Sequence, residues 1–180
     1  SLLAGALIAR EDGPALDPML IAREAQGHPL FVAELARSKR TLDQEGQGDL
    51  TLESVIWERA STLPQGAMQV LEVLAIASGP LPVPVLQLVT GLPPSDLDRM
   101  LGQLRLGAFA RSVAGGAVRR IERYHDRVRA AVIEHSSPER ISELHAMLAP
   151  LLEQEPGVDP EQVAQHYLEA GDRVKAAELF

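Results

Sequence analysis

Apolar residues recur at helical spacing along most of the chain, which predicts a series of short helices. In its middle part the predicted helices span residues 51–63, 67–78, 83–90 and 95–106. The second is apolar almost all round, which is typical of a helix buried in a core. Ser95 and Asp98 have the spacing of a capping box, so Ser95 is expected to cap the fourth helix.

The apolar pattern changes period near residue 108. Residues 108–113 and 117–124 are predicted to form two strands, with Gly115 and Gly116 able to supply the positive φ of a tight hairpin. The apolar positions of this hairpin are Phe109, Val113, Val118 and Ile121. Helices followed by a two-stranded hairpin are typical of a winged helix, so we expect a winged-helix domain over residues 49–136.

The rest of the chain is predicted to be helical as well. Helices are expected over residues 126–135 and 138–154, and a helical pair begins at Asp159 and turns at Gly171. The inward face of the long helix is predicted to contain Leu144, Met147, Leu148 and Leu151. Residues 1–48 also have helical periodicity, and the polar stretch 41–49 marks a linker. The fold is therefore expected to be mainly α, with segments 1–48, 49–136 and 137–180.

Charge and composition exclude several classes of function. The chain has 180 residues and a formal net charge of -8, which argues against a general nucleic-acid binder. Its only lysines, Lys39 and Lys175, do not follow a glycine, so the chain contains no P-loop to hold a nucleoside triphosphate. It has no cysteine, so disulfide frameworks and thiolate metal sites are excluded, and a cytoplasmic location is the default expectation. No apolar run approaches the length of about 18 residues that a membrane helix needs.

Because the chain begins at Ser1 and stops within a helical pattern, we expect it to be cut from a longer protein.

The positive charges are concentrated in and after the predicted hairpin. The segment from Arg111 to Arg129 contains six arginines and only two acidic residues, Glu122 and Asp126. A basic hairpin on a winged helix could bind DNA, so a DNA-binding module with a helical dimerisation tail is the alternative function. Asp96 at the start of the predicted recognition helix disfavours DNA binding.

The histidines at positions 28, 135, 145 and 166 show no metal-ligand spacing, and structural roles are expected for them.

Three sequence motifs resemble those of one protein family. Residues 27–35, GHPLFVAEL, resemble the GNPFFLEEL signature in the helical lid of STAND-type signal-transduction ATPases, a branch of the AAA-type ATPases. Residues 124–132, YHDRVRAAV, resemble the signature that opens the last helix of their winged-helix domain. Residues 159–180 are similar to a tetratricopeptide repeat. Small Ala164 and Ala176 would lie where its two helices cross, and Phe180 falls at a spacing that the repeat requires. The same domain order occurs in LuxR-type regulators and in bacterial multi-domain serine/threonine kinases.

The resemblance implies a role for four residues. Gly27 and Pro29 would lie against the adenine and ribose of a bound nucleotide. His125 would contact the β-phosphate of ADP, and Asp126 would cap the helix that follows. The implied cofactor is ADP or ATP with Mg, bound to an upstream P-loop domain.

The implied partners are that domain, downstream helical repeats, a protein ligand and, through self-association, further copies of the chain. The fragment itself would catalyse nothing, and it would relay the nucleotide state to an output domain, a kinase or a transcription regulator. A plain helical interaction scaffold remains a third hypothesis.

Overall fold

The computed structural model describes residues 51–114 and 118–180, and residues 60–180 form one compact unit. Helix α4 (Leu52–Ser61) begins after Thr51, whose hydroxyl oxygen accepts a hydrogen bond from the backbone N–H of Ser54 at 3.1 Å. Its buried residues Leu52, Val55, Ile56 and Ala60 follow the predicted helical spacing. The helix expected over residues 51–63 is therefore confirmed.

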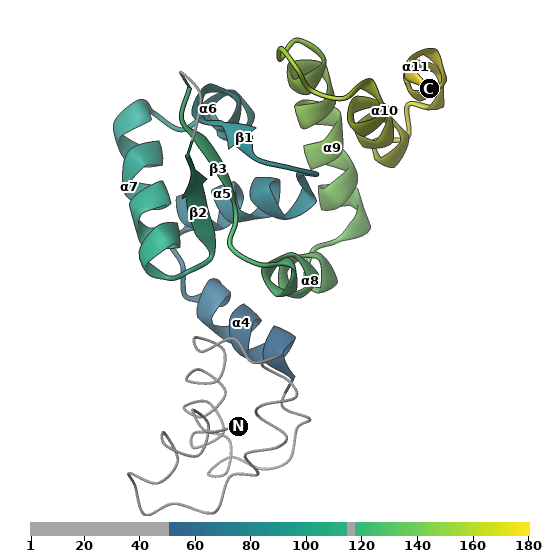
Figure 1. Cartoon of the computed structure of the whole chain (residues 1–180). Helices are drawn as coiled ribbons and strands as arrows, with labels where there is room; N and C mark the ends of the chain where they lie inside the picture. Colours follow the sequence, from purple (N-terminus) through teal and green to yellow (C-terminus); the bar gives the residue numbers. More distant parts are fainter. Residues whose placement is uncertain (1–50, 115–117) are drawn as a thin grey trace, which may run out of the picture. The chain divides into compact units, whose positions relative to one another are not determined.

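The centre of the compact unit is α5 (Gln65–Ile76), which contacts the helices α6, α7, α8 and α9 and the strand β3 (Figure 1). Seven of its twelve residues are buried, which is why its sequence is apolar on nearly every side. Helix α6 (Val83–Thr90) ends at Gly91, whose φ of 66° is in the left-handed region that glycine tolerates. Helix α7 (Pro94–Leu106) places Leu97, Met100, Leu101 and Leu104 in the core, as predicted.

A small antiparallel sheet packs against α5 and α7. Its strands are β1 (Leu81–Pro82), β2 (Ala110–Val113) and β3 (Arg120–Arg123), in the order β1-β3-β2. Ile121 on the central strand pairs with Leu81 on one side and Ser112 on the other, and it is fully buried. The sequence predicted only the hairpin, because β1 is two residues long and lies among prolines. The mainly α fold with a small hairpin is confirmed and gains a third strand.

The remaining helices are α8 (Asp126–Glu134), α9 (Pro138–Glu153), α10 (Pro160–Glu169) and α11 (Arg173–Leu179). Helix α9 packs against α5 and α6 on one side and α10 on the other (Figure 1). The side chains of Ser137, Asp159 and Asp172 cap α9, α10 and α11 by accepting backbone N–H groups. Ala164 and Ala176 are buried in a helical hairpin that turns at Gly171, with φ 87°.

Two details of the prediction are wrong. Helix α7 is capped at Pro93 and begins at Pro94, so Ser95 is not its cap. A proline in the first turn has no N–H to satisfy and a φ already suited to a helix. On α9 the buried face contains His145, Ala149 and Leu152, whereas Met147 is 43% exposed. The face is shifted because α10 covers a second side of α9. Leu151, also predicted to face inward, is half-buried.

Replacement by alanine should change the free energy of unfolding in opposite directions at Gly102, within α7, and at Gly107, its C-cap. A Cβ on Gly107 would lie 2.8 Å from Cδ2 of Phe109, a buried ring that cannot move aside. We expect Gly107→Ala to lower the free energy of unfolding by about 1–2 kcal/mol through overpacking. Gly102 has open space around its Cα, so Gly102→Ala should raise that free energy by about 0.5–1 kcal/mol through helix propensity. Urea unfolding measures both, and a change of the same sign in the two variants would contradict this account.

Candidate functional site

The predicted nucleotide-contacting residues His125 and Asp126 lie where β3 passes into α8. The backbone of His125 is extended, with φ -154° and ψ 154°, so His125 occupies the N-cap position of α8. Its Nδ1 accepts a hydrogen bond from the backbone N–H of Arg127 at 3.2 Å. A neutral imidazole whose Nδ1 accepts must carry its proton on Nε2. His125 thus presents Nε2–H as a donor.

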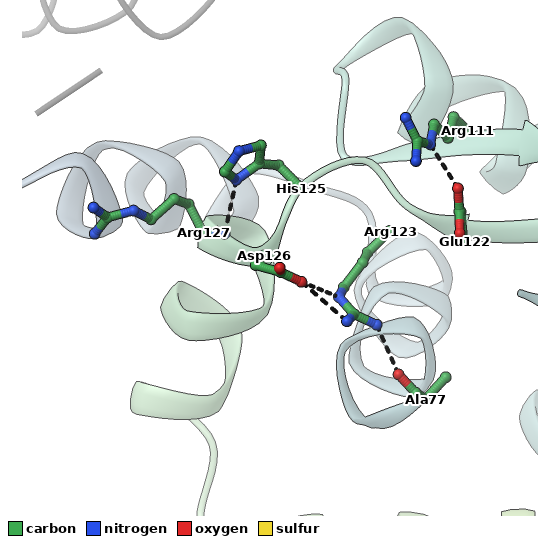
Figure 2. A network of polar contacts seen from close by, with 7 residues as sticks. All are labelled: Ala77, Arg111, Glu122, Arg123, His125, Asp126 and Arg127. Atoms are coloured by element: carbon green, nitrogen blue, oxygen red, sulfur yellow. Dashed lines mark hydrogen bonds and ion pairs between the residues drawn. The ribbon is translucent and has the colours of Figure 1, made fainter. Parts of the chain in front are cut away.

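Asp126 does not cap α8, contrary to the prediction. The helix already begins at Asp126, and its carboxylate turns back toward β3, where Oδ1 lies 3.1 Å from Nε and 3.0 Å from Nη2 of Arg123. Figure 2 shows the imidazole of His125 on the side of Arg127, whereas Asp126 points to Arg123. The carboxylate prefers this ion pair because His125 has already taken the capping position.

Arg123 is the residue of this site that sequence reasoning missed. Besides Asp126, its guanidinium donates through Nη1 to the backbone oxygen of Ala77 at 2.7 Å, and its side chain is only 20% exposed. Arg123 therefore joins three elements: β3, the start of α8 and the segment just after α5 (Figure 2). The sequence showed it only as one of six clustered arginines.

A polar depression of about 300 Å³ adjoins this junction. Its lining comprises Ser78, Gly79, Arg111, Glu122, Arg123, Tyr124, His125 and Asp126. Within this lining, Nε of Arg111 donates to Oε1 of Glu122 at 2.7 Å. The lining therefore includes an imidazole, two guanidinium groups that are each paired with a carboxylate, and the start of a helix, and imidazole, guanidinium and helix start are all groups that can bind an anion.

The other arginines of the hairpin pair with acidic residues from distant parts of the chain. Arg119 pairs with Asp98 of α7, and Arg120 lies 3.9 Å from Glu155, which follows α9. The sequence placed only two acidic residues among these arginines. The fold brings Asp98 and Glu155 to them as well, so less positive charge is available to DNA phosphates than the local sequence indicates.

Gly27 and Pro29, the predicted adenine and ribose contacts, lie outside the described residues. Within residues 51–114 and 118–180, no group of three or more His, Cys, Asp or Glu side chains is arranged to hold a metal ion. In the same ranges, no helix has the length and apolar content needed to cross a bilayer.

No family model matches this sequence, and no curated protein matches it significantly. The function therefore has to be argued from the site itself and from the motifs in the sequence.

Proposed function

We propose that this chain is the regulatory part of a nucleotide-switched signalling ATPase, in which His125 contacts the β-phosphate of ADP. The observation that carries the proposal is the orientation of His125. Its Nδ1 accepts from the backbone of α8, so the donor of the neutral ring is Nε2–H. An imidazole Nε2–H donor suits a phosphate oxygen.

The surroundings of His125 also favour an anionic ligand. Arg111 and Arg123 line the same depression, and it opens at the N-terminus of α8, where the helix dipole attracts negative charge. Both guanidinium groups are already paired with a carboxylate, Glu122 and Asp126 respectively. A phosphate would compete with these carboxylates, so its arrival would alter the contacts that tie β3 to α8.

This competition suggests how a nucleotide state could be relayed. Arg123 holds the backbone of Ala77 as well as Asp126, so a phosphate that shifts Arg123 acts on α5 and α8 together. In the proposed switch, a lid with Gly27 and Pro29 and the winged helix close over ADP on an upstream P-loop domain. Exchange for ATP with Mg, or a protein ligand on downstream helical repeats, releases the winged helix and activates a kinase or a transcription regulator.

The test is ADP release from the full-length protein that contains this chain. We expect His125→Asn to accelerate ADP dissociation about 10- to 100-fold and to raise basal output, because a hydrogen bond to a charged group is lost. Asparagine is chosen because it still caps a helix, so α8 keeps its start. The control is His135→Asn at the other end of α8, which should leave ADP release unchanged. Unchanged dissociation in a folded His125→Asn protein would refute the assignment.

A further inference from the structure

Two histidines that the sequence analysis assigned to separate structural roles are in contact inside the protein. His145 of α9 and His166 of α10 place their Nδ1 atoms 2.8 Å apart, with ring centroids at 4.8 Å. Their exposed fractions are 7% and 1%. They are 21 residues apart along the chain, so no short-range spacing marks the pair.

The contact continues to the segment between α5 and β1. Nε2 of His166 lies 3.4 Å from the hydroxyl oxygen of Ser78. Two arginines of β3 hold the residues on either side of Ser78 and Gly79. Arg123 donates to the backbone oxygen of Ala77, and Arg120 donates to the backbone oxygen of Pro80 at 3.3 Å. The two histidines therefore link α9 and α10 to a turn that is itself anchored on the sheet.

The geometry of the pair limits how many protons it can hold. At 2.8 Å one Nδ1 must donate and the other must accept, so at least one of the two rings is neutral. Two tautomer arrangements satisfy this, one with His145 as donor and one with His166 as donor. If both rings were protonated, two N–H groups would face each other and the hydrogen bond would be lost.

The charged groups around the pair act in both directions. Glu169 of α10 favours a positive His145 ring, and Arg129 of α8 opposes one more weakly. Arg120 and Asp159 line the same cavity as His166. Helix α6 has no charged residue, Glu72 of α5 is paired with Arg140 of α9, and on α11 Lys175 is paired with Glu178.

Burial is the main influence on both rings. Burial, and to a smaller extent the neighbouring His145, together lower the pKa of His166 to about 4. Burial also lowers the pKa of His145, an effect that Glu169 opposes and Arg129 reinforces. A cavity of about 230 Å³, bounded by the α5–β1 turn and by residues before and within α10, reaches His166.

We propose that His145 and His166 form a proton-sensitive clasp that holds α10 and α11 against α9 and the α5–β1 turn, and that opens when the rings become protonated. The clasp works without a nucleotide and is independent of the role proposed for His125. Above pH 6.5 both states of α10 have neutral rings, so the clasp is fully effective. As the pH falls toward 4, the open state binds protons more readily than the closed state, and the clasp is lost.

Hydrogen exchange of the 180-residue chain tests where the opening occurs. Between pH 7.5 and pH 5.0, after correction for the intrinsic exchange rates, we expect opening of α10 and α11 to increase about 30-fold, the value that follows from the lowered pKa of His166. Exchange in α5 and α7 should change much less. The Tyr167 hydroxyl, which donates to Glu153, does not itself titrate between these pH values, because burial and that hydrogen bond raise the pKa of Tyr167 to about 12.

The double variant His145→Gln and His166→Gln keeps polar side chains but cannot titrate. Its α10–α11 exchange should be the same at both pH values, whereas His135→Gln, a change outside the pair, should behave as the unmodified chain. Equal pH responses in the double variant and the unmodified chain would overturn the proposal. If the double variant does not fold, NMR titration of the imidazoles in the unmodified chain decides. Two independent transitions near pH 6.5 would then exclude the clasp.

Discussion

Replacement of Leu71 by alanine should lower the free energy of unfolding of the compact unit by about 3–4 kcal/mol. Leu71 is fully buried in α5, the helix that contacts α6, α7, α8, α9 and β3. The loss has two parts: the transfer free energy of the removed methyl and methylene groups, and the cavity that they leave. Because α5 is enclosed by several elements, the neighbouring side chains can fill this cavity only in part.

Urea unfolding followed by circular dichroism gives this number, and Leu106→Ala is the matched control. Leu106 is at the end of α7 and is 90% exposed, so its truncation should change the free energy of unfolding by less than about 0.5 kcal/mol. Equal losses in the two variants would show that α5 is not the centre of the core.

Replacement of Arg123 by methionine should lower the free energy of unfolding by about 2–3 kcal/mol. The change removes the ion pair with Asp126 and leaves the oxygen of Ala77, a buried residue, without its 2.7 Å donor. Hydrogen bonds to charged groups contribute about 1.5–3 kcal/mol each, and a buried acceptor left unpaired adds a desolvation cost. Methionine keeps the length and the apolar stem of the side chain, so lost packing contributes little.

Two further variants separate the geometry of Arg123 from its charge. Arg123→Lys should recover less than half of the loss, because an ammonium group cannot reproduce the planar fork that reaches Asp126 and Ala77 together. Arg99→Met is the control for a surface arginine: Arg99 pairs with Asp96 at 2.7 Å, but its side chain is 65% exposed, and we expect less than about 0.5 kcal/mol. Full rescue by lysine would mean that charge alone matters at position 123.

Most helices were predictable because their signals are local. The apolar residues of α5 and α7 recur within one or two turns, and Ser137, Asp159 and Gly171 mark helix ends through their own backbone or side-chain chemistry. The same local reasoning failed at Ser95, where two competing start signals, a capping box and a proline pair, were only one residue apart. It also placed Met147 in the core, because periodicity alone does not say which neighbours cover a helix.

The site was predictable only in part. His125 was singled out from a motif, and its position at the start of α8 agrees with that motif. The capping role, however, belongs to His125 and not to Asp126, because the extended backbone of β3 continues through position 125. Whether His125 meets a phosphate is a question for the ADP-release experiment.

The sequence by itself determined the mainly α class, the hairpin and the starts of most helices, since each depends on residues within a few positions of one another. Only the tertiary structure decided which side chains meet. It brought Arg123 to Ala77 across 46 positions, Ser78 to His166 across 88, and His145 to His166. These contacts arise when helices and strands pack to bury apolar surface, and polar groups trapped between them must then find partners. No spacing within one element records that pairing, so the arginine anchor and the histidine pair emerged only from the fold.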